Sequence, residues 1–170
     1  MLEESFDDET SAYAAEGTAG HALAEHLIKR YLKQQTKRPV SDYYTDELVD
    51  AVNDYVEFVI GQIEEARRTC KDPVFSVEQR VDASEYVEGC YGTADMVIIT
   101  DEMVHIIDLK LGKGVAVDAT ENSQLMIYGL GMLQKAELLY DPHIVRLSIY
   151  QPRIYNYSTW DTTPDACLLY

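Results

Sequence analysis

The chain has 170 residues, of which 46% are hydrophobic and 26% charged, and its net charge at pH 7 is −16. This length and composition fit one globular domain and exclude a disordered chain or a collagen-like repeat. The longest aliphatic run, at residues 96–99, is far short of the ~20 residues that cross a bilayer, and the acidic N-terminus is unlike a secretion signal. We therefore expect a cytoplasmic protein without membrane contact. The charge makes DNA a poor partner on composition alone, because Lys and Arg supply most non-specific nucleic-acid affinity.

The predicted elements begin with two helices. Residues 1–10 have no apolar period and are predicted to form a loose acidic lead-in. Apolar residues at four-residue spacing then predict a helix over residues 17–33, which ends before Pro39. Thr45 is the expected N-cap of a second helix, which continues to about Arg68.

Strands follow the two helices. Alternating patterns predict strands at residues 74–82, 91–100 and 103–110, and the short connection between the last two predicts an antiparallel hairpin. A helix over residues 120–139 is then a crossover to a strand at 144–150, parallel to a neighbour with a right-handed connection. Residues 156–170 remain an unassigned tail. The whole chain, residues 1–170, is thus one α/β domain with a small mixed four-stranded sheet flanked by helices, in the order α-α-β-β-β-α-β.

Three cysteines are present, and no two of them form a C-x-x-C pair. This number and spacing argue against a disulfide framework and against a four-thiolate metal site. We expect Cys70, Cys90 and Cys167 to be reduced structural thiols.

Charged residues interrupt two of the predicted strands. Asp108 and Lys110 are two residues apart, so they point to the same face of the sheet, and Asp95 lies within the preceding strand. If the hairpin forms, Asp95 and Asp108 lie near the same end of neighbouring strands. Two converging carboxylates suit a hard divalent cation, Mg²⁺ or Mn²⁺. The alternative is a strand-end ion pair between Asp108 and Lys110, with Asp95 facing water.

Other polar residues admit both a structural and a functional interpretation. His21 shares a partly buried helix face, where a core or capping role is common. Glu78 lies within a strand and would ordinarily face solvent, and Gln124 and Tyr128 share one helix face as surface or satisfied interior groups. Lys113 lies between two glycines, where it could contact a phosphate or be solvated.

Taken in chain order, these residues form motifs that resemble those of the RecB-like branch of the PD-(D/E)XK nuclease superfamily, and of prophage-encoded RecB-like proteins in particular. The resemblance spans about residues 10–152 and implies a restriction-endonuclease-like core. The matching motifs are Glu16-Gly17-Thr18-x-x-His21, Glu78, Gly92-Thr93-Ala94-Asp95, Asp108-Leu109-Lys110 and Gln124-x-x-x-Tyr128.

The resemblance implies a role for each matched position near the carboxylates. His21, Asp95 and Asp108 would ligate Mg²⁺ or Mn²⁺, together with the backbone carbonyl of Leu109. Lys110 would orient the attacking water and stabilise charge on the phosphate. An imidazole among the ligands would favour Mn²⁺.

More distant positions have supporting roles in the same interpretation. Glu78 would support metal-bound waters or a second ion. Gln124 and Tyr128 would contact the DNA backbone or brace the site, and Lys113 would contact a phosphate from its loop.

The resemblance implies a metal-dependent DNA nuclease, with exonuclease action in phage recombination or end processing as the expected setting. A homo-oligomer that gathers lysines and arginines around a channel would reconcile DNA binding with the charge of −16, and a phage recombination protein is an expected partner. One alternative is a catalytically inactive nuclease fold that serves as an acidic interaction module of a phage assembly. Another is a metal-dependent hydrolase of a different phosphodiester.

Overall fold

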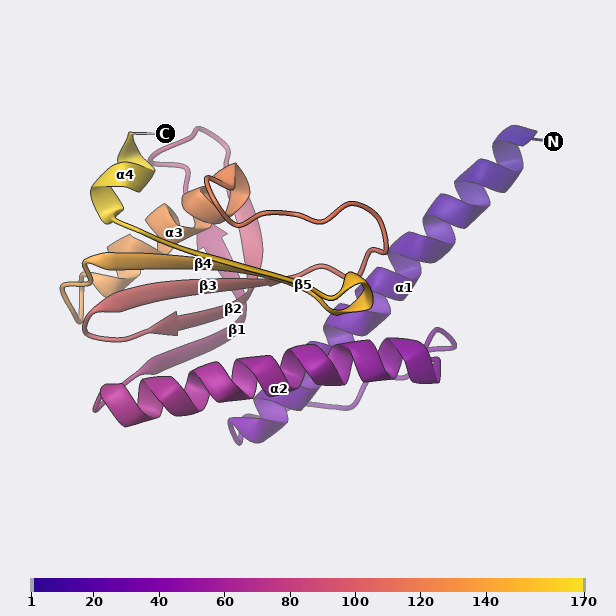
Figure 1. The fold of residues 1–170 in the computed structure, drawn as a ribbon, viewed down its shortest axis with the longest axis horizontal. Coiled ribbons are helices and arrows are strands. Elements are labelled where there is room, and N and C mark those ends of the chain that lie inside the picture. Colours follow the sequence, from indigo (N-terminus) through magenta and orange to yellow (C-terminus); the bar gives the residue numbers. More distant parts are fainter. Residues whose placement is uncertain (1, 170) are drawn as a thin grey trace.

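The structure, a computed structural model, describes residues 2–169, with side chains from residue 9 onward. One five-stranded sheet, in the order β1-β2-β3-β4-β5, lies between two layers of helices. Figure 1 draws α2 and the C-terminal part of α1 below the sheet, with the rest of α1 rising past the side of the sheet, and α3 and α4 above it. The elements are α1 (Leu2–Tyr31), α2 (Asp46–Thr69), β1 (Val74–Asp82), β2 (Tyr91–Ile99), β3 (Met103–Leu109), α3 (Ser123–Ala136), β4 (Ile144–Gln151), the 3₁₀ turn η1 (Pro152–Ile154), β5 (Asn156–Thr162) and α4 (Pro164–Leu168).

The sheet is mixed, as its sequence pattern predicts. Strands β1, β2 and β3 form an antiparallel meander, and β4 pairs parallel to β3 after the crossover through α3. The prediction of four strands is wrong, because β5 pairs antiparallel with the outer side of β4. The tail left unassigned at residues 156–170 therefore supplies this edge strand and the short helix α4.

Each face of the sheet has its own apolar core. Beneath it, the apolar face of α2 is buried, with Leu48, Val52 and Ile63 fully covered. The predicted cap is also present, since the Thr45 side chain accepts a hydrogen bond from Leu48 N at 3.2 Å. Above the sheet, the apolar side of α3 packs over β3 and β4. The two cores pack against opposite faces of the sheet and hold its strand ends in place. The site described below is built from these strand ends.

Helix α1 differs most from its prediction. It begins at Leu2 rather than near residue 17, so residues 2–10 belong to a helix and not to a loose lead-in. Residues 9–14 of this helix are exposed, and the Tyr13 side chain is 71% exposed. A helix segment that buries nothing needs no apolar stripe, and the prediction relied on that stripe.

Two further properties of the described chain bear on its setting. None of its helices combines the length and the apolar character that a membrane span requires. Cys70, Cys90 and Cys167 are all free thiols, in agreement with the prediction.

Candidate active site

Strand register brings the predicted carboxylates together. Met96 of β2 lies opposite Ile107 of β3, so the next positions along the two strands, Asp95 and Asp108, face each other. On the other side of β2, Val77 lies opposite Met96, which sets Glu78 of β1 opposite Asp95. The three acids therefore form a row across β1, β2 and β3.

The strands β2 and β3 separate at this row, and side chains take over their hydrogen bonds. Leu109 N donates to Asp95 Oδ2 at 2.7 Å, in place of a backbone partner on β2. The backbone of Lys110 remains fixed on the other side, where its N–H donates to Tyr150 O at 2.9 Å. Asp95 is thus held in the gap between two strands, with only 14% of its side chain exposed.

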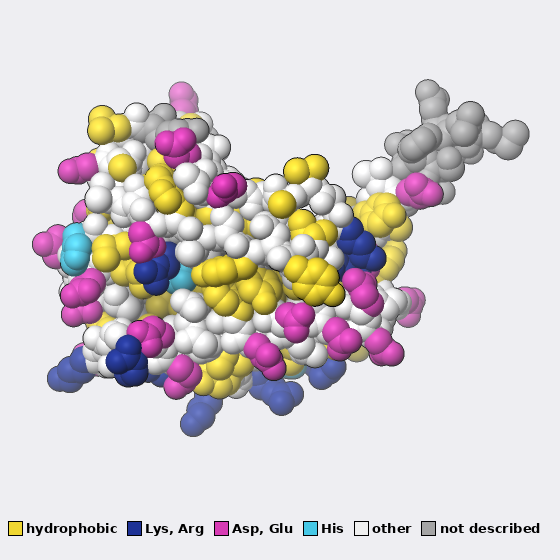
Figure 2. Space-filling view, in the orientation of Figure 1, with side chains coloured by type: hydrophobic (Ala, Val, Ile, Leu, Met, Phe, Trp, Pro, Cys, Tyr) yellow, Lys and Arg dark blue, Asp and Glu magenta, His cyan; other side chains and the backbone are white. Residues whose placement is uncertain are grey.

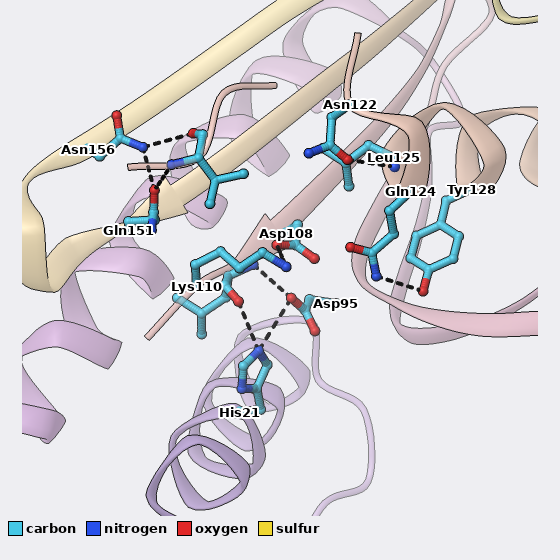
Figure 3. A network of polar contacts seen from close by, with 12 residues as sticks. His21, Asp95, Asp108, Lys110, Asn122, Gln124, Leu125, Tyr128, Gln151 and Asn156 are labelled. Carbon is cyan, nitrogen blue, oxygen red and sulfur yellow. Dashed lines mark hydrogen bonds and ion pairs between the residues drawn. The ribbon is translucent and has the colours of Figure 1, made fainter. Parts of the chain in front are cut away.

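His21 joins the row from α1 (Figure 3). Its Nδ1 lies 2.9 Å from Gly17 O, and its Nε2 lies 3.0 Å from Leu109 O and 3.5 Å from Asp95 Oδ2. All three partners are acceptors, so both ring nitrogens donate and the ring is an imidazolium. Burial alone would lower the pKa of His21, but the Asp95 carboxylate and the two carbonyls outweigh it and raise the pKa to about 9.

Asp108 and Lys110 form a close ion pair at the mouth of the row. Lys110 Nζ lies 2.9 Å from Asp108 Oδ2. Asp108 Oδ2 is buried, and beyond this ion pair no hydrogen-bond partner is found for it among the described residues. Burial, and then the Asp95 charge, raise the pKa of Asp108, while Lys110 opposes the shift. The predicted ion pair and the predicted convergence with Asp95 are therefore both present.

Glu78 adopts a backbone conformation that is rare within a strand. Its φ is +51°, in the left-handed region, which costs a non-glycine residue on the order of 1–3 kcal/mol. Phe75 and Val77 before it pack with α1 and α2, whereas Val81 after it packs in the core beneath α3. The alternation of β1 thus reverses at Glu78. Burial, then Asp95 and Glu25, raise the pKa of Glu78 to about 7.

A cleft of about 580 Å³ opens over Asp95 and Asp108, whereas Glu78 does not line it and borders a second hollow with His21 and Glu25. Asp95, Asp108, Lys110 and His21 line the cleft, together with Tyr13 of α1 and the loop at residues 111–114. Lys113 projects from this loop and lies 3.8 Å from Glu47 of α2, with most of its side chain exposed. The predicted catalytic lysine and the loop lysine therefore border one cavity.

Arg153 forms a wall of the cleft that the sequence did not predict. Its side chain is only 5% exposed, and it pairs with Glu16 of α1 and Glu47 of α2. Its Nη1 also donates to Leu111 O at 3.1 Å, which fixes the start of the cleft loop. An isolated arginine after Pro152 carries no sequence signal of this role.

The far end of the same loop is held by the side-chain amides of the buried Gln151 and the half-buried Asn156. Gln151 Oε1 accepts from Val117 N at 2.7 Å and from Asn156 Nδ2 at 2.6 Å, and Asn156 Nδ2 also donates to Val117 O (Figure 3). Residues 112–114 consequently form a short exposed span between two anchored points. Gln151 and Asn156 were also missed, because each is an ordinary polar residue at a strand end.

Gln124 and Tyr128 lie apart from the cleft lining. Gln124 Nε2 donates to Tyr128 Oη at 3.2 Å, so the two polar groups on α3 are hydrogen-bonded to each other. The Tyr128 ring covers Gly92, where an added Cβ would lie 2.2 Å from Tyr128 Oη. The pair braces the strand that carries Asp95, and neither residue lines the cleft.

The side chains at the site could ligate a divalent cation only in part. Among residues with described side chains, no three His, Cys, Asp or Glu groups are arranged to hold a metal ion. His21 has both nitrogens engaged as donors, so it would have to lose a proton before it could ligate. Oxygen ligands of the kind that Mg²⁺ and Mn²⁺ take with waters are nevertheless present: Asp108 Oδ2, which is buried in its ion pair with Lys110, the facing Asp95 and the Leu109 carbonyl.

The chain matches a known protein family over almost its whole length. A family model described as "Protein of unknown function (DUF2800)" matches residues 1–168. The chain therefore belongs to the DUF2800 family.

Proposed function

We propose that this member of the DUF2800 family is a divalent-metal-dependent DNA nuclease with a restriction-endonuclease-like core, and that it acts as an exonuclease. The observation that carries the proposal is the facing pair Asp95 and Asp108, with Lys110 at 2.9 Å from Asp108 inside a cleft. Two carboxylates and a lysine at separating strand ends provide what phosphodiester hydrolysis requires: oxygen ligands for a cation and a positive group beside the phosphate.

Asp95, Asp108 and the Leu109 carbonyl would hold Mg²⁺ or Mn²⁺, and the ion would lower the pKa of a bound water and neutralise phosphate charge. Lys110 would release its contact with Asp108 to hold the attacking water or a phosphate oxygen. His21 orients the Asp95 carboxylate through their 3.5 Å contact. Glu78 stands next in the row, where it would support waters around the site.

The cleft walls suit the approach of a strand end. Lys113 extends from the loop at residues 111–114 and could contact a phosphate beside the reacting one. DNA in the cytoplasm is the proposed substrate, in phage recombination or end processing with a recombination partner protein. Gln124 and Tyr128 support this chemistry from α3 by bracing β2 through Gly92.

The proposal is tested by digestion of end-labelled linear and closed-circular DNA with Mn²⁺, Mg²⁺ or EDTA. Lys110→Ala is compared with Lys71→Ala, which changes an exposed lysine in the turn after α2. We expect metal-dependent degradation of linear DNA, sparing of circles, and a loss of about 100-fold or more only in the Lys110 variant. Degradation that persists in EDTA, or equal rates for both variants, would contradict it.

The second candidate is a non-catalytic acidic interaction module that retains the nuclease fold. The net charge of −16 and the engagement of His21 and Asp108 in internal pairs favour it. It predicts no DNA degradation with either metal and no calorimetric Mn²⁺ binding. Mn²⁺ binding without DNA cleavage would show that the site holds a cation but does not catalyse hydrolysis.

A further inference from the structure

The positive charge of the chain is concentrated in one short segment. Residues 29–38, here called the basic segment, contain five of the fourteen lysines and arginines and none of the thirty acids. Arg30, Lys33, Lys37 and Arg38 are exposed. Figure 2 shows lysine and arginine side chains gathered along the lower edge of the molecule, where α1 ends in Figure 1.

Most of this charge is not neutralised within the protein. Lys29 pairs with Glu25, but the four exposed cations form no ion pair with any residue whose side chain the structure describes. Arg68 in α2 differs, since it pairs with Glu65 one helical turn away. The basic segment is therefore an uncompensated patch on an otherwise acidic protein.

A favourable interaction with the helix dipole does not account for the patch. Cations stabilise the last turn of a helix, and the effect falls off beyond that turn. Lys33, Lys37 and Arg38 follow the end of α1 at Tyr31. Only the charges at residues 29 and 30 have that structural explanation.

The basic segment is ordered and rigidly attached to α1. Lys33 has a φ of +58°, which reverses the chain at the end of the helix, and Gln34 N donates to Lys29 O at 2.9 Å. Thr36 Oγ1 then lies 3.1 Å from Nδ1 of the buried His26. The cations are thus presented from a fixed turn.

The same helix connects the patch to the candidate active site. His21 lies ten residues before the end of α1 at Tyr31, about 15 Å along the helix axis, and the exposed cations flank that end. One strand of DNA covers that distance in about four nucleotides at 3.4 Å each. A strand that runs along α1 from a reacting phosphate in the cleft would therefore bring its neighbouring phosphates to the basic segment.

We infer that the basic segment binds the backbone phosphates of DNA about four nucleotides from the phosphate in the cleft. The inference rests on the proposed function, because that function places the DNA in the cleft. The contact is independent of sequence, since lysines and arginines recognise the phosphate charge. It also explains how a protein with a net charge of −16 binds DNA: the cations are gathered on the path of the strand.

The test compares two variants that each lose two positive charges. K37Q/R38Q removes half of the unpaired patch, and R68Q/K71Q removes two cations at the end of α2. DNA affinity is measured in EDTA by fluorescence anisotropy with a labelled 24-nucleotide duplex, over a range of salt concentrations. We expect K37Q/R38Q to raise Kd on the order of tenfold at 0.1 M salt and to lower the salt slope by about 2, since each phosphate contact contributes about 0.9. R68Q/K71Q should leave both quantities near the wild-type values.

Equal effects of the two variants would overturn the inference, because net charge alone would then control binding. An unchanged Kd in K37Q/R38Q would also overturn it. If sedimentation shows that K37Q/R38Q disrupts a dimer while DNA affinity stays constant, the patch binds the acidic surface of a second copy instead.

This design separates the inference from the proposed function, because binding in EDTA requires no cleavage. Patch-dependent binding without metal-dependent degradation would support the inference and reject the nuclease. Metal-dependent degradation with DNA binding that does not depend on the patch would support the nuclease and reject the inference.

Discussion

Replacement of Arg153 by methionine tests whether this side chain holds the cleft together. Methionine keeps much of the volume and removes the charge and all donors. The guanidinium makes three directed contacts, to Glu16, to both oxygens of Glu47 at 3.0 and 2.7 Å, and to Leu111 O at 3.1 Å. Its side chain is 5% exposed, whereas those of Glu16 and Glu47 are 20% and 54% exposed.

These exposures determine the expected size of the effect. The contact with Glu47 contributes little, because that carboxylate is more than half exposed and well screened. Most of the lost stability comes from two groups: the Glu16 carboxylate, which loses its buried partner, and the Leu111 carbonyl, which loses its hydrogen-bond donor. We expect the free energy of unfolding to fall by about 2–4 kcal/mol, which lowers Tm by roughly 5–15 °C in a domain of this size.

A double-mutant cycle with Glu16→Gln checks the cause. Urea denaturation should give a double variant that is more stable than the sum of the single losses predicts, by about 1–2 kcal/mol, because the orphaned carboxylate is gone. Arg153→Lys should recover only part of the loss, since one ammonium group cannot reproduce a planar fork. Additivity within about 0.5 kcal/mol, together with full recovery by lysine, would refute the reasoning.

Four further substitutions test three other features, each by denaturation. Tyr55→Phe should raise the free energy of unfolding by about 1 kcal/mol, because Tyr55 Oη is buried without a hydrogen-bond partner among the residues that the structure describes; a loss of that size would reveal a hidden acceptor. Gly92→Ala should cost about 1–3 kcal/mol, because its Cβ would lie 2.6 Å from the Tyr128 ring, whereas Gly17→Ala meets nothing within 4 Å and should stabilise α1. Burial, then Arg146, lower the pKa of His105 to about 3, so the unfolded chain takes up its proton first, and the contribution of His105 to stability is full above pH 6.5 and falls by about 1 kcal/mol between pH 7 and 5.5. The stability of the wild type relative to His105→Gln should therefore fall by that amount between pH 7 and 5.5, and a difference that does not change with pH would contradict the assignment.

Periodicity predicted the parts of the fold that bury a regular face. The stripe of α2 and the hairpin of β2 and β3 follow directly from spacing, and the register that sets Asp95 opposite Asp108 follows from the hairpin. The exposed start of α1 has no such face and was missed. Strand β5 had a usable signal in the β-favouring run from Tyr157 to Trp160, but it lies at an edge and is only half-buried.

The candidate site was predictable where one element carries several of its residues. Asp108, Leu109 and Lys110 are consecutive, so a short motif describes them. Arg153 acts through contacts with three distant segments, and no local pattern contains that information. The left-handed conformation of Glu78 is likewise a product of strand pairing and has no signal in its neighbours.

The ion pair between Glu16 and Arg153 also determines when the cleft can exist during synthesis. Its partners are 137 residues apart, so one wall forms only after β4 has been made. A ribosome-bound chain that already contains Asp95, Asp108 and Lys110 still lacks the strand beside β3 and the arginine that fixes the loop. Because chains fold from the N-terminus as they emerge, the acidic row is exposed long before it is enclosed. The complete cleft therefore requires synthesis past Arg153, and shortened products that end before β4 carry the motif without the cavity.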